Sequence, residues 1–476
     1  MSTGRNALWL TGCRLTGDVL NLLLFVLISR TFGPAGAGEY SYGFAVATFA
    51  FVIGCLGIEE YGLRQYSRMD EDARPGFLGE LLGTQVLMVG LAVLTLVVYI
   101  AVTAPTPATL LMVCVLGAYQ ITASIVATLF IPAMAAQRML WPALAELGAR
   151  SIAFAIAGYA ISVAHASLAH ALLGYPVAAA VWLTIALTAL RRFAPHVKVR
   201  ISAGGARRIA GIIWSFALLE VFAQLFSRIG VISLSLGVGD AAAGIFATGL
   251  RLIEVALMPL SFLGVASYPR LSRLFSTDLQ AFRRSAVDLA WLMMLGGGLA
   301  AWGLYFVAPP LLVPILGERF AGAEPWIQSM VVFALVQAVE VCLGRIMLCA
   351  DRQISNAAFV AVGAVLSLLL NIWWVPRFGV SGAIYAGAAA YFVIDVLCVA
   401  SLRRAMTLAA LLRVIGSLIV TVAAAAAAGA LAARWDISAA VQAVAALAVF
   451  AGAGALAHRF RHSAGGAALA APGGLP

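Results

Sequence analysis

The segment "GPAGAGEYSYG" at residues 33–43 presents two possibilities, a glycine-rich phosphate-binding loop or a tight turn between two apolar helices. When the sequence is shifted by 206 residues, this segment aligns with "GDAAAGIFATG" at residues 239–249. The aligned glycines are Gly33 with Gly239, Gly38 with Gly244 and Gly43 with Gly249. The inner Gly36 meets Ala242, and neither segment contains a lysine. Since a phosphate loop depends on those inner backbone positions and a turn does not, the alignment predicts a repeated turn.

The predicted turn ends the first apolar span. Glycine supplies a positive φ angle or lets two backbones approach closely, and Pro34 helps to stop the helix. We expect Tyr40 and Tyr42 to lie at the membrane interface, where aromatic side chains are enriched. If the protein binds a phosphate, we expect arginine side chains deeper in the bundle to hold it.

The composition around this turn is that of a membrane protein. The 476 residues are 63% hydrophobic and 11% charged, with a mean hydropathy of +1.01. Soluble domains are about half apolar and about a quarter charged, so we predict an all-α polytopic membrane protein. The net charge of +10 comes from short basic clusters between apolar segments, which disfavours nucleic-acid binding. The six cysteines and five histidines are scattered, which predicts neither a disulfide nor a metal site.

About fourteen segments are apolar enough to span a bilayer, which requires about 20 residues each. The segment that begins at Met1 lacks a small-residue cleavage site and is predicted to be retained as the first helix. The predicted spans are 6–29, 41–63, 81–103, 108–131, 143–164, 167–190, 210–236, 242–268, 287–308, 326–350, 357–375, 380–402, 411–433 and 437–457.

The loops predict the orientation and the domains. With both termini in the cytoplasm, cytoplasmic segments hold 21 Lys and Arg residues and the opposite loops hold 4. A second match places "AAQRM" (135–139) on "CADRQ" (349–353), and six spans separate each pair of matches. An even number of spans gives two six-helix lobes with the same orientation, in a parallel pseudo-two-fold repeat around a central cavity. The predicted domains are lobes at 1–190 and 210–402, a basic cytoplasmic linker at 191–209, two further helices at 403–457 and a cytoplasmic tail at 458–476.

Five arginines lie inside the spans, and each shares its helix with an acid. The pairs are Arg14/Asp18, Glu146/Arg150, Glu220/Arg228, Arg251/Glu254 and Glu340/Arg345, whereas Asp395 stands alone. A charge at mid-bilayer costs roughly 2.5–3.5 kcal/mol and usually faces a cavity or a partner. Glu146/Arg150 is interpreted as a structural ion pair, and Arg14, Arg228 and Arg251 are interpreted as cavity residues. Because the 206-residue shift aligns Arg14 with Glu220, we hypothesise that these two approach across the cavity.

Other charged residues suggest a gate and an ion site. Glu59, Glu60 and Arg64 close the second span at the cytoplasmic face, either as a gate or as a solvated helix end. Arg345 is a further gate candidate. The acids that are candidates for carrying a coupling ion are Glu220, Glu254, Glu340 and Asp395.

Sequence signatures of enzymes are missing. Lys198, the only lysine, has no glycines before it, which excludes a Walker A loop, and neither HExxH nor GxSxG occurs. A polar cavity, a repeat and no ATP-hydrolysing motif together predict a secondary transporter without enzyme activity or a cofactor.

The order of these motifs resembles bacterial polysaccharide flippases, the Wzx-like branch of the MOP superfamily that also includes the lipid II flippase and the MATE exporters. The matching residues of the first half are Arg30, Gly33, Gly38, Tyr40, Gly57 and Arg64. The second half matches at "PRLS" (269–272), "ILGERF" (315–320), "ADR" (350–352), Asn371 and "PRFGVSGA" (376–383). The resemblance covers nearly the whole chain.

The resemblance implies a substrate and a mechanism. The substrate is polyprenyl-pyrophosphate carrying an oligosaccharide, moved by alternating access from the cytoplasmic to the outer leaflet of the bacterial inner membrane for O-antigen, capsule or exopolysaccharide synthesis. Arginines of the first, second and eighth spans are the family's candidates for gripping the pyrophosphate, which points to Arg14 and Arg251 here, with Asp18 and Arg228 beside them. The second span offers only Arg64, at its end. H⁺ or Na⁺, a polysaccharide polymerase and chain-length proteins are the implied partners.

Two alternatives stay open. A MATE-like cation-coupled exporter needs acids without opposing charges, and only Asp395 has no arginine on its helix. A membrane enzyme such as a polymerase or acyltransferase normally needs a sizeable outer loop, which the predicted layout lacks.

Overall fold

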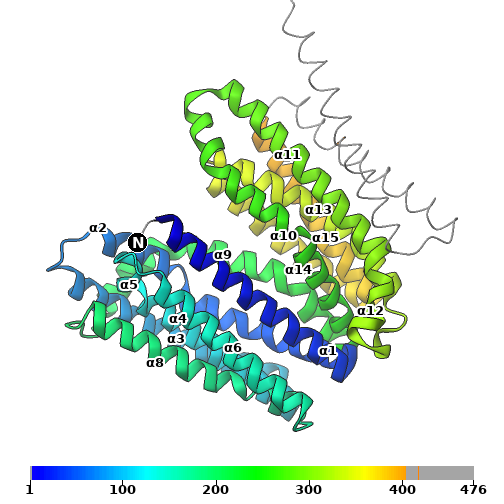
Figure 1. The fold of residues 1–476 in the computed structure, drawn as a ribbon, viewed down its shortest axis with the longest axis horizontal. Coiled ribbons are helices and arrows are strands. Elements are labelled where there is room, and N and C mark those ends of the chain that lie inside the picture. The colour runs from blue at the N-terminus through cyan, green and yellow to red at the C-terminus, as the bar shows by residue number, and fades with distance from the viewer. Residues whose placement is uncertain (1–2, 404–415, 417–476) are drawn as a thin grey trace, which may run out of the picture. The chain divides into compact units, whose positions relative to one another are not determined.

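All regular secondary structure in the described part of the chain is helical. The computed structural model describes residues 3–403 and residue 416 (Figure 1). Ten helices within that part are long and apolar enough to cross a membrane, which confirms the predicted all-α polytopic class. The predicted spans 411–433 and 437–457 and the tail 458–476 lie outside the described residues, apart from Gly416.

Helices cover each of the first twelve predicted spans. Their bounds are α1 (Thr3–Cys55), α2 (Ile58–Arg68), α3 (Arg74–Thr103), α4 (Pro107–Leu129), α5 (Ile131–Ala135), α6 (Leu140–Ser162), α7 (Leu168–Ala171), α8 (Gly174–Phe193), α9 (Ala203–Gly237), α10 (Asp240–Thr277), α11 (Leu279–Trp302), a π-helical segment η1 (Gly303–Val307), α12 (Ala308–Leu316), a 3-10 turn η2 (Glu318–Phe320), α13 (Glu324–Cys349), α14 (Gln353–Phe378) and α15 (Val380–Leu402).

The predicted turn at 33–43 is a break at one residue. Gly33 has φ 71° and ψ −166° inside α1, and the helix resumes at once with Pro34. Proline at a first helical position starts a helix as readily as it stops one, so the second span begins earlier than the predicted residue 41. Tyr40 and Tyr42 are buried, and their hydroxyls hydrogen-bond to Tyr175 and Tyr99. The prediction of interfacial tyrosines is therefore wrong.

The two copies of the turn meet in a reciprocal contact. A Cβ atom at Gly38 would overlap the carbonyl oxygen of Asp240, and a Cβ at Gly244 would overlap the carbonyl oxygen of Pro34. Asp240 is the counterpart of Pro34 under the 206-residue shift, so each copy makes the same contact with the other. Close approach of two backbones is thus the reason for these glycines.

The second sequence match also extends to conformation. Gln137 and Asp351, which the match aligns, both have positive φ angles, 57° and 54°. The following amides, of Arg138 and Arg352, donate to the carbonyls five residues back, each at 2.9 Å. The two segments therefore end their helices in the same way.

The chain divides into two compact units. Among the described residues, unit 1 comprises 3–247, 315–320 and 364–383, and unit 2 comprises 248–314, 321–363, 384–403 and residue 416. In unit 1, α1 packs against α3, α4, α6 and α9, and α8 packs on α4 and α6 (Figure 1). In unit 2, α11 packs against α13. The division into lobes at 1–190 and 210–402 stays a prediction.

Candidate functional site

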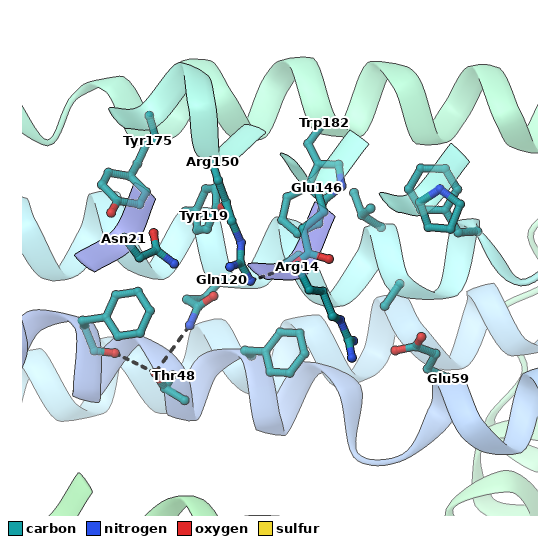
Figure 2. Close-up of a pocket in the computed structure, with 18 of the residues that line it drawn as sticks. Arg14, Asn21, Thr48, Glu59, Tyr119, Gln120, Glu146, Arg150, Tyr175 and Trp182 are labelled. Atoms are coloured by element: carbon teal, nitrogen blue, oxygen red, sulfur yellow. Dashed lines mark hydrogen bonds and ion pairs between the residues drawn. The ribbon is translucent and has the colours of Figure 1, made fainter. Parts of the chain in front are cut away.

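A cavity of about 530 Å³ opens inside unit 1, among α1, α2, α4, α5, α6, α8 and α9 (Figure 2). Its volume is in the range of about 300–1,000 Å³ that is usual for ligand sites. Five charged residues line it: Arg14, Glu59, Glu146, Arg150 and Arg228. The apolar helices α1, α6 and α9 carry four of them, and the short polar helix α2 carries Glu59. The charges on the apolar helices face a shared polar space in a membrane protein.

Arg14 is the exposed arginine of this cavity. It makes no hydrogen bond or ion pair with any residue in the described part of the chain. Figure 2 shows its guanidinium directed toward Glu59, and the two opposite charges attract. Because no carboxylate holds it, Arg14 has donors available for an anionic ligand.

Arg150 is held from two sides. Its guanidinium contacts Asp18 at 2.7 Å and Glu146 at 2.6 Å. The pair with Glu146, four residues apart on α6, confirms the predicted structural ion pair. The predicted partnership of Asp18 with Arg14 is wrong, because Asp18 lies on α1 and its carboxylate turns to Arg150 on α6. Arg150 therefore pairs with two carboxylates, and one negative charge of this group of three is left without a counter-charge.

The α9 side of the cavity carries Arg228. Its guanidinium stacks on the Phe44 ring, 5.8 Å from the ring centroid. Glu220, two turns earlier, is exposed and accepts a hydrogen bond of 2.9 Å from Gln224. Glu220 does not line the cavity, and no ion pair joins it to Arg14 within residues 3–403. The hypothesis that these two approach each other is not supported.

Uncharged polar and aromatic residues form the rest of the polar wall, and the sequence analysis did not single them out. They are Asn21, Thr48, Tyr119, Gln120, Tyr175, Trp182 and Gln224. Tyr119 packs edge-on against Tyr175 at 5.0 Å and tilted against Trp182 at 5.7 Å. The amide of Gln120 donates to Thr48 at 3.4 Å. Asparagine and glutamine within apolar spans were the available signal, because such residues are rare there without a partner or a cavity.

Only one of the three gate candidates on α2 lines the cavity. Glu59 is partly buried and lines it, whereas Glu60 and Arg64 are exposed and do not. The position of Glu59 is thus compatible with a role in gating. The positions of Glu60 and Arg64 are compatible with the alternative, a solvated helix end.

The remaining candidates lie in unit 2. Arg251 and Glu254 form the expected pair, at 2.9 Å on α10. Arg345 on α13 packs its side chain next to Gly264, and its helix neighbour Glu340 is partly buried. Asp395 on α15 is 7% exposed, and its Oδ1 has no hydrogen-bond partner in residues 3–403. No group of three or more His, Cys, Asp and Glu residues suited to a metal occurs among the described residues.

A comparison with known protein families identifies the family of this chain. A family model described as polysaccharide biosynthesis protein matches residues 3–275, more than half of the chain. The chain belongs to the polysaccharide biosynthesis protein family. This confirms the resemblance drawn from the sequence motifs. A comparison with curated proteins gives no match.

The fold of this family member is similar to those of a lipid II flippase and of MATE transporters. The lipid II flippase MurJ, in an inward closed conformation, matches with a TM-score of 0.76 at 11% identity over 94% of this chain and 98% of that one. An inward-facing multidrug resistance MATE transporter matches with a TM-score of 0.61 at 11% identity, over 84% and 95% of the two chains. The MATE transporter VcmN of Vibrio cholerae, in its bent form, matches with a TM-score of 0.51 at 15% identity, over 84% and 97%. At these identities the likeness establishes the fold.

Proposed function

We propose that this protein is a flippase that moves polyprenyl-pyrophosphate-linked oligosaccharide from the cytoplasmic to the outer leaflet of a bacterial inner membrane. Membership of the polysaccharide biosynthesis family supports the glycan, and the MurJ-like fold supports a lipid-linked substrate. The observation that carries the proposal is Arg14, an arginine without an ion-pair partner in residues 3–403, on an apolar helix and facing a cavity.

The charges of the cavity favour an anion. Asp18 and Glu146 compensate Arg150, so these three bind no further anion without losing an ion pair. Arg14 is directed only toward the single carboxylate of Glu59. A pyrophosphate brought to Arg14 gains charge-assisted hydrogen bonds from a forked guanidinium, which replace part of its lost hydration.

The proposed transport cycle separates the two ends of the substrate. The pyrophosphate and glycan occupy the polar cavity, while the polyprenyl chain stays in the bilayer, where burying it costs nothing. The proposal keeps both termini in the cytoplasm, as the basic loops predict, and alternating access turns the cavity from the cytoplasmic to the outer side. Arg251, paired with Glu254 in unit 2, is the second proposed pyrophosphate ligand. No covalent step is needed, so the substrate leaves chemically unchanged and no enzyme activity is proposed.

Asp395 is the proposed coupling site for H⁺ or Na⁺. It is buried, its Oδ1 lacks a partner in the described part of the chain, and no arginine shares its helix. An acid in this setting also suits the second candidate function, a MATE-like cation-coupled exporter.

The decisive experiment measures flipping in proteoliposomes. Polyprenyl-pyrophosphate oligosaccharide is placed on one leaflet, and its arrival on the other is followed with a glycan-binding protein. We expect Arg14→Ala to lower the flipping rate at least about tenfold, with partial recovery in Arg14→Lys, because lysine keeps the charge but loses the fork. Arg377→Ala is the matched control, since Arg377 is exposed and donates to the Trp373 carbonyl of its own helix.

Two results contradict the proposal. If the Arg14→Ala variant flips the substrate at the wild-type rate, the proposed anion site at Arg14 is refuted. Ion-dependent efflux of a cationic drug by the wild-type protein, without flipping of the lipid-linked glycan, establishes the exporter instead.

A further inference from the structure

The connection between α8 and α9 ends in an extended segment, residues 197–202, which we call the strap. The strap lies on the first half of α3, where the amide of Arg200 donates to the carbonyl of Gly79 at 2.9 Å. A Cβ atom at Gly79 would overlap the carbonyl oxygen of Lys198, and a Cβ at Gly83 would overlap that of Arg200. The two glycines therefore let the backbone of the strap approach α3, which a side chain at either position would prevent.

Both ends of the strap are held as well. At its start, Val197 packs against the apolar core of unit 1. At its end, the hydroxyl of Ser202 caps α9 by accepting a hydrogen bond of 3.3 Å from the amide of Gly205. The first turns of α9 are tied to α3 by an ion pair between Arg208 and Glu80. The strap is thus fixed along its length, and so is the order of its exposed side chains.

The strap alternates basic and apolar side chains. Lys198 and Arg200 are exposed, and Val199 and Ile201 are 55% and 63% exposed. Because successive side chains of an extended backbone point to opposite sides, the two cations lie on one side and the two apolar residues on the other. A surface that offers cations and large apolar groups together suits the interface of a membrane, where each kind finds its own surroundings.

The position of the strap on α3 matches that interface. The predicted third span begins at residue 81, and the contacts of the strap at Gly79 and Gly83 lie on either side of this start. In the described part of the chain, α3 is the least buried of the ten candidate spans, and its exposed apolar side chains begin at Val86. Lipid therefore covers much of α3, and the strap lies where the hydrocarbon gives way to the headgroups.

The surface around the strap is strongly basic. Residues 191–208 contain six Lys and Arg residues and no Asp or Glu. Arg208 pairs with Glu80, and the other five are exposed and form no ion pair with any residue of 3–403. These five are Arg191, Arg192, Lys198, Arg200 and Arg207. In the orientation predicted from the loops they face the cytoplasmic leaflet, where clustered cations attract anionic headgroups.

We infer that the strap binds anionic phospholipid of the cytoplasmic leaflet, with the headgroup phosphate at Lys198 and Arg200 and the acyl chains against Val199 and Ile201. A zwitterionic lipid has no net charge to offer the cations, and a soluble phosphate has no chain to cover the apolar side chains. The inference goes beyond the proposed function and does not depend on which substrate is transported.

The test measures lipid binding to the purified full-length protein. Native mass spectrometry in micelles gives the binding constants of phosphatidylglycerol and phosphatidylcholine that carry the same acyl chains. The variant Lys198→Gln/Arg200→Gln removes two charges from the strap. The control Arg270→Gln/Arg273→Gln removes two exposed charges from α10, where neither residue forms an ion pair with a described residue.

A second pair of variants moves the strap without changing any charge. The Cβ of Gly83→Ala overlaps the Arg200 carbonyl and displaces the strap from α3. Gly90→Ala, on the same helix, is the matched control, because a Cβ at Gly90 meets no atom within 4 Å. This pair distinguishes a positioned lipid site from attraction by the overall positive charge.

Selective loss of the anionic lipid is the expected result. We expect Lys198→Gln/Arg200→Gln to weaken phosphatidylglycerol binding about tenfold or more, because each basic residue at an anionic membrane surface contributes about fivefold. Gly83→Ala weakens it at least about threefold, and both controls stay within about twofold of wild type. Phosphatidylcholine binding by the charge variants also stays within about twofold, which shows that they are folded, and a monodisperse elution profile shows the same for Gly83→Ala.

Four outcomes overturn the inference. The wild-type protein binds the two lipids equally, or the strap and control charge pairs weaken phosphatidylglycerol binding to the same extent. Gly83→Ala binds phosphatidylglycerol like wild type, which removes the role of the docked strap. Soluble glycerol phosphate displaces the lipid, which shows a site for free phosphate instead. Each of these results leaves the flippase proposal standing, because none of them measures flipping.

Discussion

A methyl group at Gly38 tests the reciprocal contact between the two copies of the turn. The added Cβ of Gly38→Ala overlaps the carbonyl oxygen of Asp240, which is backbone and cannot rotate away. Overpacking typically costs about 1–3 kcal/mol, and we use the upper value because backbone must move. Replacing a helical glycine by alanine returns about 1 kcal/mol. The expected net loss of stability is about 2 kcal/mol.

Gly43, five residues later on the same helix, is the matched control. A Cβ there meets Leu116 Cδ1 at 3.4 Å and Met112 Cβ at 3.7 Å, which are ordinary contacts. Gly43→Ala is therefore expected to stabilise the protein by about 0.5–1 kcal/mol through helix propensity alone. The two substitutions are chemically identical and have effects of opposite sign.

Equilibrium unfolding in mixed micelles with increasing denaturing detergent measures the difference. A gap of about 3 kcal/mol between the two variants corresponds to roughly a hundredfold ratio in their unfolding equilibria, from 1.4 kcal/mol per factor of ten. Gly244→Ala overlaps the Pro34 carbonyl at the same contact, so its cost is expected to be less than additive with that of Gly38→Ala. Equal stability of Gly38→Ala and Gly43→Ala refutes the contact.

Two further substitutions probe charges that the structure places in different settings. Asp18→Asn is expected to cost at most about 1 kcal/mol in the same unfolding assay, because the Asp18 side chain is 52% exposed; Arg150→Ala is expected to cost about 3 kcal/mol, because it leaves Glu146 unpaired among apolar helices. Equal costs contradict this assignment of partners. Asp395→Asn is expected to abolish the dependence of flipping on a pH or Na⁺ gradient while downhill flipping continues, measured in the same proteoliposomes; an unchanged gradient dependence excludes Asp395 as the coupling site.

The helices were predictable because the length and apolarity of a membrane span can be read from one segment of the sequence alone. A stretch of about 20 apolar residues has few alternatives to a helix when its backbone groups must bond internally. The restart of α1 at Pro34 was not predictable in this way, since proline is compatible with a helix end and with a first turn. The same error led to the wrong prediction for Tyr40 and Tyr42, because these residues lie on the helix that restarts at Pro34 and are buried in the bundle.

Ion pairs were predictable only where both partners share a helix. The spacing of Glu146 and Arg150 places them on one face, and the structure joins them at 2.6 Å. Arg14 and Asp18 have the same spacing of four residues, yet Asp18 pairs with Arg150 instead. Spacing along one helix carries no information about which neighbouring helix competes for a carboxylate, and that depends on packing.

The competition for Asp18 has a consequence for the cavity. If Arg14 and Asp18 formed their own pair, both would be neutralised on α1, and Arg150 would keep only Glu146. The observed arrangement instead concentrates two carboxylates on Arg150 and leaves Arg14 with Glu59 as its nearby acid. The total charge is the same in both arrangements. Only the observed arrangement leaves the Arg14 guanidinium without an ion-pair partner in the described chain, in a cavity that is also lined by uncharged polar residues. An anion joined to a neutral, hydroxyl-rich group fits that distribution, and the choice of partner by Asp18 is what creates it.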